Sequence, residues 1–251
     1  MKEKRFEVAK RSLLYHEVIA VIFRALVHGR IKPGERLVEE EIAEELGVSR
    51  SPVRRALVEM AQMGVVDLVP RKGARIKTWS IDEIVDFWRF RVLIEGLAVE
   101  QAVERMTDAE MDQLLELTRT LEAAIKKDSL EKITDLDLKF HESIVKASRN
   151  NSVISSYESM LLRIQIFMII EKHFYRSERA YYSSLDSHWK IYESIKMRDA
   201  TQARKMMVEH IEQSVEDLFA RMQDYIQESE SDDFPGIFES ILKEESLNEK
   251  F

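Results

Sequence analysis

Apolar side chains recur at helical spacing along most of the chain. The first such segment spans residues 12–29, and its apolar positions are Leu13, Leu14, Val18, Ile22, Ala25 and Leu26. Because an α-helix turns once every 3.6 residues, this spacing places them on one face. The same pattern predicts helices at about 38–46, 51–63, 80–106, 107–127, 129–148, 152–176, 178–198 and 200–229, with a further short helix at 237–247. The fold class is therefore mostly α.

Local signals mark where several of these helices begin. Ser51 followed by Pro52 predicts a hydroxyl N-cap with proline at the first helical position. Ser80 with Glu83, and Thr107 with Glu110, have the three-residue spacing of a capping box. We therefore expect helices to begin at these three places.

The helical pattern is interrupted once, between residues 64 and 78. Residues 65–70 and 74–78 alternate between apolar and polar around the basic turn Arg71-Lys72-Gly73, which predicts a β-hairpin. Two short helices joined by a turn with Gly47 precede it. We therefore expect a winged helix-turn-helix in residues 1–78, an antiparallel all-α bundle in 79–229 and a C-terminal extension in 230–251.

Composition supports long helices and restricts the chemistry. The 251 residues include only 7 glycines and 4 prolines, and no cysteine, so thiolate ligands and disulfides are excluded. The basic N-terminus precedes a segment with His16, Glu17 and Arg24, which fits neither a signal peptide nor a membrane span. We therefore expect a cytoplasmic protein that does not bind membranes.

The net charge of −8 is unevenly distributed. Residues 1–78 contain 16 Lys and Arg against 11 Asp and Glu, a balance of +5, which leaves 22 against 35 for residues 79–251, a balance of −13. Because positive surfaces attract nucleic-acid phosphates, the N-terminal part is the expected DNA-binding surface.

The predicted winged helix offers polar side chains where such a domain contacts DNA. A helix in the major groove needs donors near its N-terminus, and wing residues reach the backbone or the minor groove. The candidates are Ser49, Arg50, Ser51, Arg54 and Arg55 on the helix, and Arg71, Lys72, Gly73 and Arg75 on the wing. The alternative is that Arg54 and Arg55 form an ordinary solvated helix face.

A resemblance to a known family favours DNA binding. Residues 42–57, IAEELGVSRSPVRRAL, follow IKPGERL at 31–37 and precede RKGA at 71–74. This pattern covers most of residues 15–77 and resembles the winged-helix signature of the GntR superfamily of bacterial transcription regulators. Arg55 departs from it, because the family usually has an acidic residue there.

Four residues in the C-terminal part form a candidate metal site. Asp137 and His141 are four positions apart and therefore lie on one face of a helix. His188 and His210 lie on two later predicted helices, each with apolar neighbours. Three imidazoles and a carboxylate suit Zn, Ni, Mn, Fe or Co. For any single histidine here, an ordinary core position is the alternative.

The same region resembles the FCD ligand-binding domain of the FadR branch of GntR regulators. The resemblance covers about residues 82–226 and is carried by Arg91-x-x-Ile94-Glu95, Asp137-x-x-x-His141, Asn150, His188 and His210. It implies that the Asp and three His residues hold a divalent cation. It also implies a small carboxylate or sugar-acid effector, with Arg91 and Arg163 as candidate contacts. The alternative for Arg91 is an i,i+4 ion pair with Glu95.

The family resemblance implies a homodimer. Together with it, these features predict a transcription repressor that binds a palindromic double-stranded DNA operator and responds to an effector at a metal site. One rival is a metal-dependent hydrolase, although no nucleophile or second acid–base motif accompanies the four residues. A second rival is a regulator with a purely structural metal and no organic effector.

Overall fold

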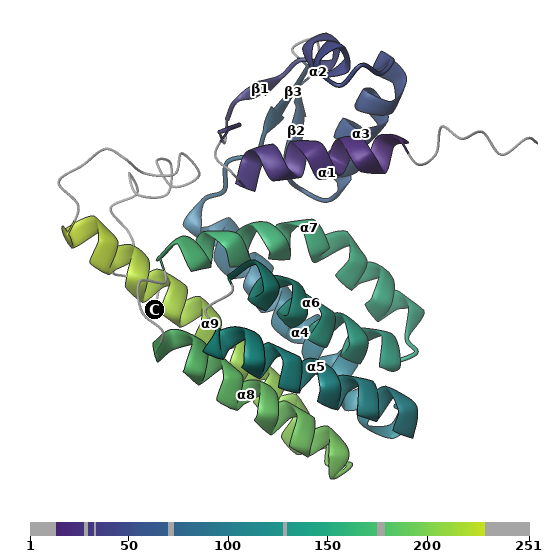
Figure 1. Cartoon of the computed structure of the whole chain (residues 1–251), viewed down its shortest axis with the longest axis vertical. Helices are drawn as coiled ribbons and strands as arrows, with labels where there is room; N and C mark the ends of the chain where they lie inside the picture. Colours follow the sequence, from purple (N-terminus) through teal and green to yellow (C-terminus); the bar gives the residue numbers. More distant parts are fainter. Residues whose placement is uncertain are drawn as a thin grey trace, which may run out of the picture. The chain divides into compact units, whose positions relative to one another are not determined.

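The computed structural model describes residues 14–27, 30–32, 34–69, 73–127, 130–174 and 179–228. Contacts divide the chain into two compact units, and the boundary between them falls between Trp79 and Ser80 (Figure 1). Arg71, Lys72 and the predicted extension at 230–251 lie outside the described residues. In the described part, no helix combines the length and hydropathy needed to cross a membrane.

The described residues of the N-terminal unit form three helices and a small sheet. Its elements are α1 (Leu14–Val27), β1 (Arg36–Leu37), α2 (Glu39–Glu45), α3 (Arg50–Gln62), β2 (Val66–Val69) and β3 (Gly73–Ile76). The strands are antiparallel in the order β1-β3-β2. The predicted hairpin is confirmed as β2 and β3, and the sheet gains β1 as a third strand. The winged helix-turn-helix expected from the sequence is present.

The apolar faces of α1 and α3 form the core of this unit. Val18 and Ile22 of α1 are buried, as are Val53, Leu57 and Met60 of α3. The turn between α2 and α3 contains Gly47 at a φ of +62°, a backbone conformation that residues with a Cβ atom rarely adopt. This turn sets the direction of α3.

The predicted start of α3 is wrong by two residues. The N-cap is Ser49 rather than Ser51, and the helix begins at Arg50, so Pro52 occupies the third helical position. Proline is accommodated there because the first backbone N–H groups of a helix have no intrahelical acceptor. Ser51 therefore lies within the first turn.

The C-terminal unit is entirely helical in its described part. It contains α4 (Ile81–Arg105), α5 (Asp108–Lys126), α6 (Leu130–Ala147), α7 (Asn151–Phe174), α8 (Arg179–Lys196) and α9 (Ala200–Glu228). Both predicted capping boxes are confirmed, Ser80 with Glu83 before α4 and Thr107 with Glu110 before α5. The predicted helix ends agree with the structure to within about two residues.

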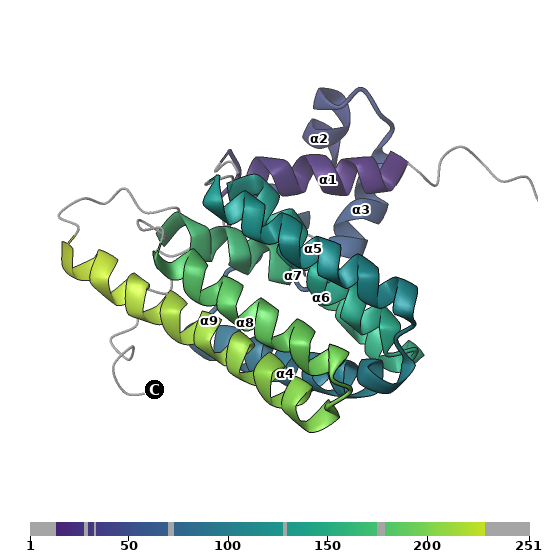
Figure 2. The same cartoon turned by 60° about the horizontal axis from the view of Figure 1, so that its bottom comes forward.

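Helix α4 occupies a central position in this unit. It packs along α9 and also contacts α6, α7 and α8, while α8 packs against α9 and α5 (Figure 2). Buried small residues on α4, Gly96, Ala98 and Ala102, allow the neighbouring helices to approach closely. This packing brings the inward faces of α6, α8 and α9 together.

Candidate metal centre

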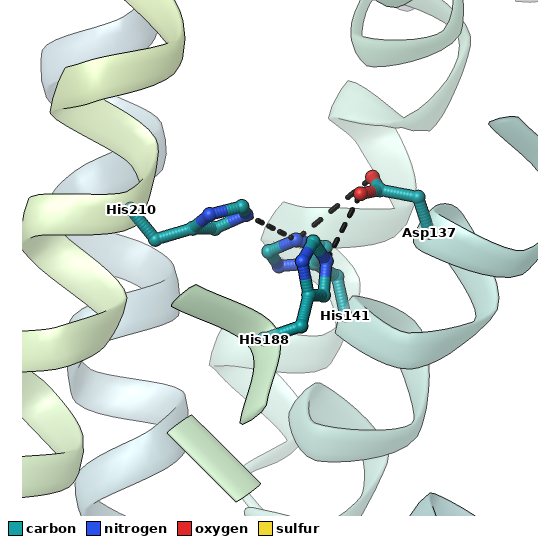
Figure 3. Close-up of side chains that lie close together, drawn as sticks. All are labelled: Asp137, His141, His188 and His210. Atoms are coloured by element: carbon teal, nitrogen blue, oxygen red, sulfur yellow. Dashed lines mark hydrogen bonds and ion pairs between the residues drawn. The ribbon is translucent and has the colours of Figure 1, made fainter. Parts of the chain in front are cut away.

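The four residues predicted as metal ligands lie together inside the C-terminal unit. Asp137 and His141 come from α6, His188 from α8 and His210 from α9 (Figure 3). One potential ligand atom from each residue lies within 4.8 Å of every other. All four side chains are buried. Three helices thus contribute to one polar cluster within an apolar core.

Distances between the donor atoms of the cluster fit a single metal ion bound by all four residues. Oδ1 of Asp137 lies 3.0 Å from Nε2 of His188, and Oδ2 lies 3.9 Å from Nε2 of His141. The Nε2 atoms of His141 and His210 are 3.2 Å apart. Two nitrogens at about 2.0–2.1 Å from one ion are separated by about 2.8–3.0 Å when adjacent in octahedral geometry and by about 3.3–3.4 Å in tetrahedral geometry. The donor set therefore fits a divalent cation that prefers nitrogen and oxygen ligands.

Two histidines of the cluster have partners on their other ring nitrogen. Nδ1 of His141 lies 2.5 Å from Oε2 of Glu95, and Nδ1 of His210 lies 2.6 Å from Oγ of Ser187. A neutral imidazole that donates from Nδ1 keeps a lone pair on Nε2. These contacts therefore turn the ligand-forming nitrogen toward the cluster, as outer partners do in metal sites.

The cluster's electrostatics favour the protonation states that bind cations. Burial by itself would raise the pKa of Asp137, but the hydrogen bond from His188 and the charges of the three histidines lower it. Burial lowers the pKa of His210 well below its usual value, and the charges of His188 and His141 lower it further. At neutral pH, Asp137 is therefore a carboxylate and His210 a neutral imidazole.

Glu95 joins this cluster to Arg91. The Nε atom of Arg91 lies 2.5 Å from Oε1 of Glu95, and both side chains are almost fully buried. Burial raises the pKa of Glu95, yet the charges of Arg91 and His141 and the hydrogen bonds from both side chains together lower it. The i,i+4 ion pair considered from the sequence is therefore present. The contact between Glu95 and His141 was not anticipated, because a pair 46 residues apart has no local spacing.

A further polar group lies near these charges on α7. The hydroxyl of Tyr157 is buried and has no hydrogen-bond partner within the part of the chain that the structure describes. Burial raises the pKa of Tyr157, and the charges of Glu95 and Asp137 add to this effect while Arg91 opposes it. Nothing in the sequence distinguished Tyr157 from an ordinary core tyrosine.

Arg163 is partly buried on the same helix. Its guanidinium carbon lies 4.5 Å from the ring centroid of Phe87, and its buried Nε atom has no hydrogen-bond partner in the described residues. Burial lowers the pKa of Arg163. Its stacking partner is therefore Phe87 on α4, rather than one of the four clustered residues.

The DNA-binding candidates lie at the surface of the N-terminal unit, and several are paired with acidic residues. Arg54 makes hydrogen bonds of 2.8–3.1 Å with both carboxylate oxygens of Glu39 on α2. Arg50 lies 3.8 Å from Glu40, and Arg75 lies 3.5 Å from Asp67. The side chains of these arginines remain 54–65% exposed. They stay accessible to a partner.

The remaining described candidates differ in their surroundings. The guanidinium of Arg55 lies 3.9 Å from the ring centroid of Tyr15, so it stacks on α1. Ser49 precedes α3 and makes no side-chain capping bond, and Ser51 is exposed in the first turn. Gly73 begins β3 at a φ of +89°, which explains a glycine at this position.

Comparison with known families identifies both units. The family described as bacterial regulatory proteins, gntR family, matches residues 14–76, and the family described as FCD domain matches residues 86–213. The chain belongs to the GntR family and carries an FCD domain. The FCD match contains all four clustered residues, and the GntR match contains α1 to β3.

Relatives of this GntR-family chain are named as transcription regulators. The uncharacterized HTH-type transcriptional regulator YdhC of Bacillus subtilis is 26% identical over 214 residues, covering 85% of this chain and 94% of YdhC. The gluconate operon transcriptional repressor of Bacillus subtilis is 25% identical over 201 residues, covering 79% of this chain and 81% of that protein. This GntR-family chain is therefore similar to these regulators over most of its length.

Solved structures of GntR-type regulators share the fold. McbR/YncC of Escherichia coli aligns with a TM-score of 0.72 at 23% identity, covering 86% of this chain and 100% of that one. A transcriptional regulator from Rhodococcus sp. RHA1 aligns with a TM-score of 0.63 at 17% identity, covering 82% and 97%. These structures therefore share the fold of this chain.

Proposed function

We propose that this GntR-family regulator is a homodimeric repressor whose operator binding is controlled by a small organic acid at a divalent-metal site. Residues 1–78 bind a palindromic double-stranded operator, and residues 79–229 bind the metal and the acid. The single observation that carries this proposal is the buried cluster of Asp137, His141, His188 and His210. Four buried ligand groups from three helices are costly to keep in an apolar core without a function.

The ligand set limits the metal and its chemistry. With no cysteine in the chain, Zn, Ni, Mn, Fe and Co are the candidates for a site of imidazoles and one carboxylate. A four-coordinate zinc ion would be saturated by these four residues. An ion that takes six ligands keeps two positions, which a carboxylate could occupy. An acid effector therefore favours a six-coordinate metal.

Neighbouring polar groups support binding of an acid. The buried hydroxyl of Tyr157 has no hydrogen-bond partner among the described residues, so it can donate to a carboxylate or a sugar hydroxyl. Arg91 contributes positive charge, although its Nε is already paired with Glu95. Arg163 stacks on Phe87, and none of the described residues accepts a hydrogen bond from its Nε atom. We assign Tyr157 and Arg91 as the nearer effector contacts and Arg163 as a more distant one.

Control of DNA binding requires that the effector bind two arrangements of the dimer with different affinity. The exposed arginines of α3 and the wing provide the DNA contacts in this scheme, with Arg54 held by Glu39 at the surface. A bidentate arginine can read guanine in the major groove. The relatives named as transcription regulators support this role over a metal-dependent hydrolase.

The metal assignment is tested with Asp137→Ala and a matched control, Asp135→Ala. Both residues lie on α6, but Asp135 is exposed and pairs with Lys139. Elemental analysis of the purified proteins should show a transition metal in the wild type and the control, and its loss in Asp137→Ala. Retention of the metal by Asp137→Ala, or a metal-free wild-type protein that also fails to bind all five candidate ions, would refute the site.

The effector assignment is tested by calorimetry on metal-loaded protein. Acetate, lactate, citrate and gluconate are suitable probes, and the DNA is a duplex selected from a random library by the wild-type protein. We expect one acid to bind and to change the affinity for this duplex, and Tyr157→Phe to weaken acid binding without loss of metal. If no acid binds and chelation only lowers stability, the rival with a purely structural metal is supported.

A further inference from the structure

One exposed apolar side chain, Val58, lies on the face of α3 that carries the DNA-binding candidates. Among the described residues of the N-terminal unit, the exposed large apolar side chains are Val58, at 39%, and Leu68 on β2, at 49%. The side chains by which α3 enters the core are Val53, Ala56, Leu57 and Met60. Val58 is not among them, so it points to solvent from a helix whose apolar face is already buried.

Val58 occupies the middle of the exposed face of α3. An α-helix turns by about 100° per residue, so Ser51, seven positions earlier, lies almost in line with Val58. Arg54 lies about 40° to one side of this line, and Arg55 lies about 60° to the other. All four side chains are exposed. Ser51 and Val58 therefore form an uncharged strip, the Ser51–Val58 strip, between two arginines.

Contacts with two other helices hold these arginines at the sides of the strip. Nε and Nη2 of Arg54 donate to the carboxylate of Glu39 on α2, at 2.8–3.1 Å. The guanidinium carbon of Arg55 lies 3.9 Å from the ring centroid of Tyr15 on α1. Because each arginine has its partner on a different helix, Val58 stays uncovered between them. The strip is thus an apolar position flanked by two fixed cationic groups.

The stability of α3 does not explain a valine at this position. A β-branched side chain loses rotamer freedom in a helix, and an exposed one gains little burial in return. The exposed face of a recognition helix meets base edges when the helix enters the major groove. On those edges, the 5-methyl group of thymine is the apolar group that a side chain can contact. Val58 therefore has a complementary partner in the groove.

We propose that Val58 is a specificity-determining residue that packs against the 5-methyl group of one thymine in each half of the operator. Cytosine has a hydrogen atom in place of this methyl group, so the contact selects thymine over cytosine. Arg54 and Arg55, at the two sides of the strip, are left to bind guanine or phosphate. The inference rests on operator binding in the proposed function and assigns one base pair of the sequence that is read.

Replacement of thymine by deoxyuridine tests this contact, because uracil pairs as thymine does and lacks only the 5-methyl group. The probe is the duplex that the wild-type protein selects from a random library, with each thymine replaced in turn in both half-sites. We expect one position at which affinity falls about fourfold for each methyl group removed, the effect expected when one methyl group is no longer buried. Fluorescence anisotropy at fixed salt measures the affinity.

Two variants show whether Val58 is the residue that responds. Val58→Ala should bind the thymine duplex more weakly than the wild type and should no longer respond to deoxyuridine at that position, because the two changes remove the same contact. Leu68→Ala, which shortens the other exposed apolar side chain of the unit, should keep the full response. Alanine favours the helix, so circular dichroism should show wild-type helix content in Val58→Ala.

The assignment of Val58 fails if no thymine position responds to deoxyuridine, or if Val58→Ala responds as strongly as the wild type. Loss of the response in Leu68→Ala as well would also overturn it, because the effect would then not be specific to α3. Where the wild type still selects a duplex and binds metal, such a failure concerns Val58 alone. A wild-type protein that selects no duplex would contradict operator binding itself, and the reading of thymine with it.

Discussion

The Nδ1 atom of His141 on α6 lies 2.5 Å from the Oε2 atom of Glu95 on α4. The other oxygen of the same carboxylate lies 2.5 Å from Nε of Arg91. Glu95 therefore fixes the orientation of a candidate ligand and balances the charge of a buried guanidinium at once. A carboxylate in this position also increases the basicity of the imidazole.

We expect Glu95→Gln to weaken metal binding about 10- to 100-fold, because an amide neither orients nor polarises His141 as a carboxylate does. Competition with a chromogenic chelator measures the affinity. Glu100→Gln is the control, since it makes the same change on the same helix at a residue that pairs with Arg204 rather than with the cluster. Equal affinities for wild type and Glu95→Gln would contradict this role.

Removal of the metal should destabilise the protein. A ligand that binds only the folded state at 100 times its Kd adds about 2.7 kcal/mol to the free energy of unfolding. We therefore expect a chelator to lower the midpoint of thermal unfolding of the wild type and to leave that of His188→Ala unchanged. His16→Ala makes the same change at an exposed site in the N-terminal unit and should keep the full response to chelator.

Arg54→Ala should weaken binding to the selected duplex by about tenfold or more, as expected when a bidentate contact worth about 1–3 kcal/mol is lost. Fluorescence anisotropy at fixed salt measures the affinity. Arg89→Ala, which removes an exposed arginine of the C-terminal unit, is the control and should bind as the wild type does. Undiminished binding by Arg54→Ala would exclude this arginine from the DNA interface.

The capping box of α5 should make stability depend on pH. Glu110 accepts hydrogen bonds from the backbone N–H of Thr107 and from Arg149, and these contacts lower its pKa. A carboxylate whose pKa is lower in the folded than in the unfolded protein stabilises the fold at pH values above its unfolded pKa of about 4.3. This stabilisation is lost as the pH falls through the folded pKa.

We therefore expect Glu110→Gln to be less stable than the wild type at pH 7 and to approach it as the pH falls through the lowered pKa of Glu110, below which both side chains are neutral. Urea unfolding at several pH values measures the difference. Glu116→Gln, at an exposed position of the same helix, should show no such convergence. A difference that persists unchanged into acid would contradict the assignment.

The sequence predicted those elements whose signals are local. The capping boxes at Ser80 and Thr107 placed the starts of α4 and α5 correctly, because each depends on residues three positions apart. Strand β1 was missed, since two residues have no periodicity and Arg36 and Leu37 are defined by pairing with β3 almost forty residues later. The start of α3 was wrong because Ser49 and Ser51 are equally good caps, and local preferences do not choose between them.

In the candidate site too, local spacing could be predicted from the sequence and contacts between helices could not. Asp137 and His141 could be paired from their spacing, but their meeting with His188 and His210 was expected from the family resemblance rather than from any pattern in the residues. The roles of Glu95, Ser187 and Tyr157 depend on contacts between different helices. Such contacts are fixed by packing and leave no spacing in one sequence.

Glu95 lies far from the first residue of α4, so a small tilt of the helix about Glu95 would displace that end by a larger distance. Glu95 is 14 residues from Ile81, the first residue of the helix, which corresponds to about 21 Å along its axis at 1.5 Å per residue. A tilt of about 5° around Glu95 would displace that end by about 2 Å, a shift typical of signalling helices. Only four residues separate Ile81 from the last residue of β3. A tilt of α4 about Glu95 would therefore displace the end of the helix that follows β3 in the sequence much more than it displaces the residues near Glu95.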